Sequence, residues 1–153
     1  MPKQSAGVML YRRVRGELEV MLVHPGGPFW SRKDAGSWSI PKGEFPESED
    51  PLRAAVRELE EETGAVVDGA LHPLKPIKQK SGKTVYGFAA ERDWDVTRLR
   101  SNTFQLEYPP KSGRMTAFPE VDRAAWFSIP AAREKILPAQ QPFLDELIAL
   151  VHQ

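Results

Sequence analysis

The chain has 153 residues, which is enough to bury a core, and we expect residues 1–153 to form a single domain. Its 21 lysines and arginines balance its 21 aspartates and glutamates, so no overall charge favours a nucleic acid or an anionic membrane as a partner. The absence of cysteine excludes disulfides and zinc–thiolate sites, and no stretch approaches the ~18 apolar residues of a transmembrane helix, so we expect a cytoplasmic protein.

Apolar runs and turn residues predict strands and helices in a mixed order along the chain. In the first half, a β-hairpin is predicted at 6–11 and 18–23, with its turn at Arg15 and Gly16. It is followed by a loop rich in glycine and proline at 25–36, a short strand at 38–40 and a helix at 48–63. In the second half, four strands are predicted at 66–74, 84–90, 103–108 and 125–129, and two helices at 130–136 and 142–151. The last segment has apolar residues at helical spacing, which predicts an amphipathic helix.

The helix after residue 48 has sequence signals for its start, its end and its buried face. The Ser48 hydroxyl is placed to cap the first turn, where Glu49 and Asp50 would be favoured by the helix dipole. Gly64 is placed to end the helix. An apolar stripe predicts the face that packs against the core: Leu52, Ala55, Val56 and Leu59. We expect this face to be separate from the acidic one.

Three glutamates on this helix form an arrangement that is unfavourable without a counter-charge. Glu58, Glu61 and Glu62 stand at i, i+3 and i+4, so they fall within one arc of about 100°. Like charges at that spacing cost a helix roughly 0.2–0.5 kcal/mol per pair. Arg57, one turn before Glu61, is placed to hold that carboxylate. A divalent cation that prefers oxygen ligands is the natural counter-ion, and a solvated acidic surface is the alternative.

The same region resembles the Nudix box, G-x5-E-x7-R-E-U-x-E-E-x-G-U, where U is a bulky aliphatic residue. Eight of the nine fixed positions agree without a gap: Gly43, Glu49, Arg57, Glu58, Leu59, Glu61, Glu62 and Gly64. The ninth is Ala65, which is smaller than the pattern requires but touches no catalytic position. The chain is thus identified as a member of the Nudix hydrolases. The resemblance implies an α/β (α+β) fold in which a mixed β-sheet is sandwiched between α-helices.

The resemblance also implies metal-dependent attack of water on a phosphoanhydride. In the family the glutamates of the box bind the metal, which implies Glu58, Glu61 and Glu62 here. The Gly43 carbonyl assists them, and Mg²⁺ or Mn²⁺ is the expected cofactor. One carboxylate serves instead as the base in some members, so Glu58 and Glu61 are catalytic candidates as well. Arg57 resembles the arginine that orients a glutamate of the box, and a surface ion pair is its alternative role.

Glu120 is the candidate outside the box. It lies six residues before Trp126, and this spacing resembles the late E-x5-W segment of many Nudix hydrolases. In those enzymes a loop glutamate reaches back to a metal or to the attacking water, so the resemblance implies a catalytic role for Glu120. Asp122 is the local rival for that role, and solvation of a loop is the alternative for both residues.

Two further segments resemble the diadenosine polyphosphate hydrolases within the family. Residues 38–43 match their W-x-x-P-K-G motif, and residues 83–90 match their K-x-V-x-x-[WF]-x-A strand. This resemblance implies that Lys42 contacts a phosphate and that Tyr86 or Phe88 stacks on an adenine. The alternatives are a solvated loop lysine and, for the two aromatic residues, packing in the core.

The loops around the acidic helix are basic, and one of them is unusual in sequence. Basic residues gather at 12–15, 32–33 and 75–83, which suits a polyanionic ligand that carries a metal. The loop from His24 to Trp30 has no counterpart in the diadenosine polyphosphate hydrolases, so it is a candidate for reshaping the pocket. For His24 itself we expect a structural role.

We therefore predict a metal-dependent pyrophosphohydrolase that cleaves a nucleoside diphosphate linked to another moiety, with diadenosine tetraphosphate, cut to ATP and AMP, as the leading substrate. The expected partner is a small-molecule nucleotide, with neither a nucleic acid nor a membrane. A nucleoside triphosphate, a nucleotide sugar or an inositol polyphosphate is the alternative substrate. A nucleotide-sensing module without turnover is the alternative class, and the complete set of glutamates argues against it.

Overall fold

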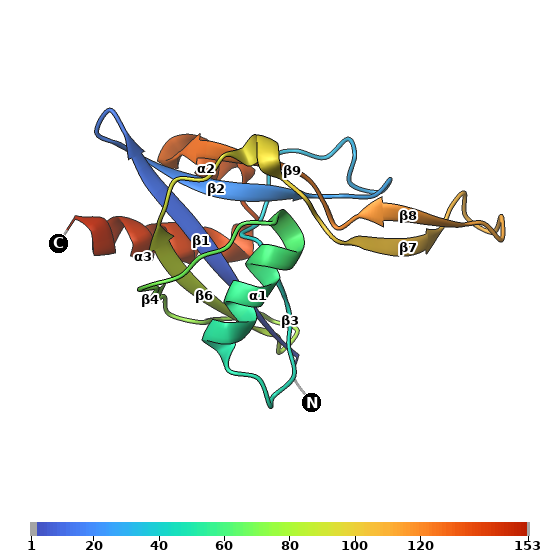
Figure 1. The fold of residues 1–153 in the computed structure, drawn as a ribbon, viewed down its shortest axis with the longest axis horizontal. Coiled ribbons are helices and arrows are strands. Elements are labelled where there is room, and N and C mark those ends of the chain that lie inside the picture. Colours follow the sequence, from blue (N-terminus) through green and yellow to red (C-terminus); the bar gives the residue numbers. More distant parts are fainter. Residues whose placement is uncertain (1–2, 153) are drawn as a thin grey trace.

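The computed structural model describes residues 3–152, which form a mixed β-sheet with helices on both of its faces (Figure 1). Seven strands make this sheet: β1 (Gln4–Val14), β2 (Glu17–Pro25), β3 (Lys42–Glu44), β4 (His72–Pro73), β5 (Ile77–Lys78), β6 (Thr84–Glu91) and β9 (Val121–Ser128). A separate two-stranded sheet contains β7 (Thr103–Glu107) and β8 (Met115–Pro119). The helices are α1 (Pro51–Thr63), α2 (Ile129–Lys135) and α3 (Gln141–Val151), with 3-10 turns η1 (Val96–Arg98) and η2 (Pro138–Gln140). The predicted fold class is confirmed.

The main sheet has the strand order β4-β6-β1-β2-β9, with β3 paired to β1 and β5 paired to β6. Strand β1 runs parallel to β6 and antiparallel to β2, and β2 runs antiparallel to β9. The β1–β2 hairpin turns at Arg15 and Gly16, whose positive φ values of 53° and 80° suit a type I′ turn. The hairpin that the sequence predicts is therefore confirmed.

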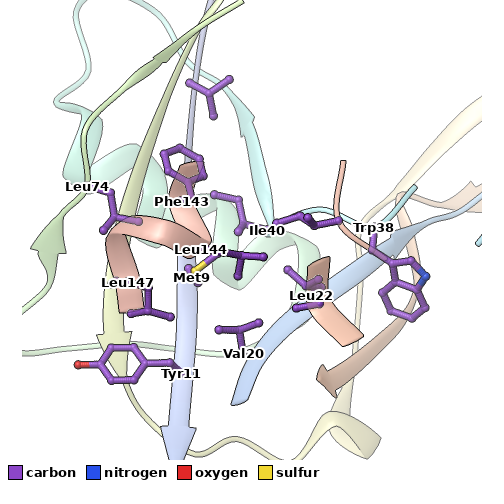
Figure 2. Close-up of a cluster of buried hydrophobic side chains, with 14 residues drawn as sticks. Met9, Tyr11, Val20, Leu22, Trp38, Ile40, Leu74, Phe143, Leu144 and Leu147 are labelled. Atoms are coloured by element: carbon purple, nitrogen blue, oxygen red, sulfur yellow. The ribbon is translucent and has the colours of Figure 1, made fainter. Parts of the chain in front are cut away.

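Strand β1 is central and buried on both faces, so alternate side chains enter two different cores. Ala6, Val8 and Leu10 pack in the core that α1 closes. Figure 2 shows the opposite core, which α2 and α3 close, through these labelled side chains: Met9, Tyr11, Val20, Leu22, Trp38, Ile40, Leu74, Phe143, Leu144 and Leu147. Burial on both faces explains why this strand appears in the sequence as a continuous apolar run.

The cap of helix α1 lies two residues after the predicted one. The Asp50 side chain accepts a hydrogen bond from the Arg53 N–H at 3.2 Å, so Asp50 caps the helix and the prediction of Ser48 is wrong. Glu49 consequently lies before the helix. The end is as predicted, because Gly64 adopts a left-handed conformation with φ 87°. No helix within residues 3–152 has the length and the apolar character of a membrane span.

The faces of α1 differ from the expected division into an apolar side and an acidic side. Ala54, Ala55 and Leu59 are buried against the sheet, whereas Leu52 is 38% exposed. Glu58 is only 7% exposed, so the acidic face is not a separate solvated surface. The small alanines bring the helix close to β1 and thereby carry a glutamate into the protein.

Several predicted strands have different limits in the structure. Only β4 forms within the predicted strand 66–74. Residues 38–40, predicted as a short strand, make isolated β-bridges instead, from Ser39 to Val23 and from Trp38 to Ile136. Strands β3, β5 and β8 were not predicted, and β9 begins four residues earlier than expected. Short pairs such as β4 and β5 depend on tertiary contacts with β6 and leave little periodicity in the sequence. The β7–β8 hairpin projects away from the main sheet (Figure 1).

Candidate active site

Glu58 reaches the interior because the facing residue on β3 is a glycine. A Cβ atom built on Gly43 would lie 2.0 Å from Glu58 Oε2, which no side chain tolerates. The first glycine of the box therefore leaves space for the glutamate of α1. Burial raises the pKa of Glu58, and the nearby Glu61 and Glu120 act in the same direction, whereas Arg57 opposes them.

Glu62 lies beside the same strand. Its Oε1 accepts a hydrogen bond from the Lys42 N–H at 3.1 Å, which ties the carboxylate to the start of β3. Burial raises the pKa of Glu62 to about 8, and the neighbouring Glu58 and Glu120 contribute to that rise. The ammonium of Lys42 is itself buried, and this burial, together with the nearby Lys83, lowers its pKa.

Arg57 organises three carboxylates at once. Its Nε and Nη2 donate to the two oxygens of Glu49 at 3.0 and 2.9 Å, a bidentate pair. Its Nη1 donates to Glu58 Oε1 at 2.9 Å and to Glu61 Oε2 at 3.1 Å. The predicted pairing with Glu61 is present, and Glu49, which is also a glutamate of the box, is a second partner. Because Glu49 holds the guanidinium from outside the helix, Arg57 is fixed in position to orient the two glutamates of the box.

Glu120 approaches the same cluster from the loop before β9. The Glu120 N–H donates to Asn102 O at 2.8 Å, and the Asn102 N–H donates to Glu61 O at 2.9 Å, so Asn102 joins this loop to the last turn of α1. Burial raises the pKa of Glu120, and the second cause is the charge of Glu61. The structure thus brings Glu120 together with the glutamates of α1.

Asp122, the local rival of Glu120, is engaged elsewhere. Its Oδ1 lies 2.8 Å from His24 Nδ1, and the other ring nitrogen of His24 lies 2.6 Å from Lys33 O. The imidazole is completely buried and packs edge-on against Trp38. His24 therefore has a structural role, in which it joins a loop to the start of β9, and Asp122 serves that joint.

The four clustered glutamates fit a hard divalent cation by their chemistry. Their oxygens are the donors that Mg²⁺ and Mn²⁺ prefer, and Glu58, Glu62 and Glu120 are each raised in pKa by a neighbouring carboxylate that a cation would neutralise. Within residues 3–152 no three histidine, cysteine or acidic side chains converge as a preformed metal site. Instead, Glu58 and Glu61 accept hydrogen bonds from Arg57, and Glu62 accepts one from the Lys42 N–H. Binding of an ion would draw these carboxylates away from their donors.

A hollow of about 200 Å³ opens beside the cluster. Its lining includes two of the glutamates, Lys42, two serines and several apolar residues: Val23, Pro25, Trp30, Ser37, Ser39, Ile40, Lys42, Glu62, Glu120, Val121 and Leu137. The volume is below the ~300–1,000 Å³ of sites that enclose a whole small molecule, so it accommodates part of a ligand. Lys42 lines this hollow, as its predicted phosphate contact requires.

The two aromatic residues predicted to stack on a base are not brought to the hollow. Phe88 is 9% exposed and packs in the core beneath α1, and Tyr86 packs edge-on against Phe45 with ring centroids 6.0 Å apart. The aromatic side chain that lines the hollow is Trp30. The sequence indicated its loop, residues 24–30, as a candidate for reshaping the pocket, but it gave Trp30 itself no role.

A sheet between helices, with glutamates gathered at one end of a helix, defines a class of enzymes that cleave phosphoanhydrides. The chain belongs to the NUDIX domain family, whose model matches residues 1–147. It is a pyrophosphohydrolase, and hydrolases of this family generally use divalent metal ions.

Two curated proteins show the sequence relationship. The chain is 29% identical over 121 residues to an RNA pyrophosphohydrolase of Brucella anthropi, in an alignment that covers 73% of this chain and 68% of that protein. It is 31% identical over 98 residues to Nudix hydrolase 7 of Arabidopsis thaliana, in an alignment that covers 60% of this chain and 34% of that protein.

Solved structures share the fold at low sequence identity. A binary complex of the C. elegans Ap4A hydrolase has a TM-score of 0.63 at 22% identity and covers 98% of both chains. The NUDIX domain of Shewanella oneidensis NrtR, crystallised with ADP-ribose, has a TM-score of 0.64 at 16% identity and covers 100% of this chain and 90% of that one. The first is an Ap4A hydrolase, and the second was crystallised with ADP-ribose. At these sequence identities, the two structures establish the fold alone.

Proposed function

We propose that the protein cleaves a dinucleoside polyphosphate such as diadenosine tetraphosphate to ATP and AMP, with Mg²⁺ or Mn²⁺ as cofactor. The observation that carries this proposal is that Glu58, Glu61, Glu62 and Glu120 lie near enough to one another for their charges to act on the pKa values of Glu58, Glu62 and Glu120, beside a hollow that Lys42 also lines. Acidic and basic groups at one place suit a polyphosphate that is bound through a cation and through a lysine.

The residues divide the work of hydrolysis among them. Glu58, Glu61, Glu62 and the Gly43 carbonyl would hold the ion, which when bound would neutralise phosphate oxygens and acidify water. Arg57 keeps Glu58 and Glu61 in place through its pairing with Glu49. The oxygen of water attacks phosphorus, the bridging P–O bond breaks, and a carboxylate of the cluster takes the proton of the water.

The choice of substrate is supported by three features. Residues 38–43 resemble the W-x-x-P-K-G motif of diadenosine polyphosphate hydrolases, and an Ap4A hydrolase shares the fold over 98% of the chain. The balanced charge, 21 basic against 21 acidic residues, favours a small molecule over RNA. A nucleoside triphosphate, a nucleotide sugar or an inositol polyphosphate is the alternative class.

Product chromatography tests the substrate. With Mg²⁺ or Mn²⁺, diadenosine tetraphosphate is expected to give ATP and AMP with a higher kcat/KM than ATP, ADP-ribose, an inositol polyphosphate or 5′-triphosphorylated RNA. The expected reason is that the longer polyphosphate of the dinucleotide gains an attraction to Lys42, which lines the hollow beside the glutamates. Two molecules of ADP, or an equal preference for mononucleotides, would remove the dinucleotide assignment and leave the hydrolase class standing.

Divalent metal is expected to stabilise the protein, because binding removes repulsion among the four glutamates. At a free metal concentration ~100 times Kd, the stabilisation is about 2.7 kcal/mol, which raises Tm by roughly 5–10 °C for a domain of this size. Thermal melts in EDTA, Mg²⁺ and Mn²⁺ measure this shift. Glu60→Gln, an exposed position on α1 outside the cluster, is the matched control and should keep the full shift. A Tm that does not respond to millimolar metal would exclude the cluster as an ion site.

A further inference from the structure

The hollow beside the glutamates has an aromatic wall. Trp30 lines it and remains 37% exposed, on the loop between β2 and β3 (Figure 1). Its neighbour Phe29 is 61% exposed and does not line the hollow. Lys33 Nζ lies 4.9 Å from the centroid of the Trp30 ring, which adds a positive charge beside the ring. An indole that stays partly open to solvent at the edge of a hollow is available to a ligand.

The loop that carries Trp30 is fixed at its start by the segment that carries Glu120. The Gly26 N–H donates to Glu120 O at 2.9 Å. A Cβ atom on Gly26 would lie 2.0 Å from Pro119 O, so only glycine allows this close approach. The loop therefore leaves β2 in direct contact with one of the proposed catalytic residues.

The same loop is fixed again three residues after Trp30, by the buried His24. This side chain joins Lys33 O to Asp122 on β9 through contacts of 2.6 and 2.8 Å. The Lys33 N–H also donates to Trp30 O at 3.0 Å and closes a turn. Trp30 thus stands between two positions, Gly26 and Lys33, that are both tied to the segment around Glu120, and its place at the hollow is built into the fold.

The lining of the hollow falls into two chemical sets. Lys42, Glu62 and Glu120 are ionisable and belong to the proposed phosphate and metal site. The other set is apolar or hydroxylic and lines the hollow together with Trp30: Val23, Pro25, Ser37, Ser39, Ile40, Val121 and Leu137. A nucleotide has the same division between charged phosphates and a planar, weakly polar base. The hollow of about 200 Å³ has room for part of such a molecule, which matches one nucleoside rather than two.

We propose that Trp30 is the wall of a base-binding subsite, against which one nucleobase of the substrate stacks. This inference rests on the proposed function, because the phosphates of the same molecule must then lie at the glutamates. It replaces the roles predicted for Tyr86 and Phe88, which pack away from the hollow. Trp30 acts on binding of the base, and the glutamates act on the phosphates.

Equilibrium titration with two probes tests the subsite without turnover. The probes are the α,β-methylene analogue of ATP, which has a base, and inorganic tripolyphosphate, which has none, each with Mg²⁺. Trp30→Leu is expected to weaken the analogue about 5- to 10-fold and to leave tripolyphosphate unchanged. Trp30→Phe should restore most of the affinity. Phe29→Leu is the matched control and should bind both probes as the wild type does.

The outcomes separate the subsite from the proposed function. Wild-type affinity of Trp30→Leu for the analogue, or an equal loss for both probes in a variant with an unchanged Tm, would overturn the subsite. The proposed function would survive either result, provided that wild-type protein still binds tripolyphosphate with Mg²⁺. Failure of the wild type to bind either probe would overturn both.

Discussion

Glu58→Gln, Glu61→Gln and Glu62→Gln are each expected to lower kcat by about 10²- to 10⁴-fold, the range that loss of a general base produces. Each change keeps the size of the side chain and removes the negative charge with which the carboxylate binds a metal ion or accepts a proton. The measurement is kcat on diadenosine tetraphosphate at saturating Mg²⁺, with Tm recorded for each variant. The Tm of Glu62→Gln should be equal or higher in EDTA, because burial already disfavours the charged form of Glu62.

A charge change elsewhere on the same helix supplies the control. Glu60→Gln alters an exposed glutamate between two of the targets and is expected to retain wild-type kcat. Near-wild-type turnover in Glu58→Gln, Glu61→Gln and Glu62→Gln together would refute the assignment of the cluster. A loss of kcat in Glu60→Gln equal to that of the three cluster variants would show that turnover falls when any charge on the helix is removed.

Gly43→Ala is expected to lower activity at least 10²-fold and to destabilise the fold by about 1–3 kcal/mol. A Cβ atom at this position would meet the Glu58 carboxylate at 2.0 Å, so either the side chain of Glu58 or β3 must move. Movement of either displaces the Glu58 carboxylate from its place among the other glutamates. Turnover and denaturant unfolding of the variant measure the two effects.

Gly69→Ala is the matched control for this substitution. A Cβ atom at Gly69 would meet nothing within 4 Å, although its φ of 89° adds backbone strain. This variant should lose some stability and keep its kcat. If Gly43→Ala behaved in the same way, with lower stability but full turnover, the proposed role of Gly43 beside Glu58 would be wrong.

The parts of the fold that were predicted well are those with a long periodic signal. The β1–β2 hairpin and α3 contain enough apolar residues at the right spacing to define their type. Elements of two residues, such as β4 and β5, have no such signal and exist because β6 offers a partner. Helix α1 was predicted, but its cap was misplaced because Ser48 and Asp50 are both good caps and only the path of the chain selects Asp50.

The acidic part of the candidate site was predicted from the motif, whereas its surroundings were not. The spacing of the glutamates on α1 is local, so the sequence contains it. Two contacts depend on distant segments and had no local signal: Asn102 between Glu61 and Glu120, and Trp30 itself on the wall of the hollow. Aromatic residues in a strand, such as Phe88, resemble binding residues in the sequence until the side of the sheet they occupy is known.

Titration of Mn²⁺ followed by electron paramagnetic resonance tests the central claim most directly, because it counts ions held by the glutamate cluster. The wild type is expected to bind Mn²⁺, and Glu58→Gln, Glu61→Gln, Glu62→Gln and Glu120→Gln are expected to weaken that binding by about tenfold or more, in parallel with their loss of turnover. Glu60→Gln should bind as the wild type does. Identical Mn²⁺ binding by the wild type and all four cluster variants would contradict the account.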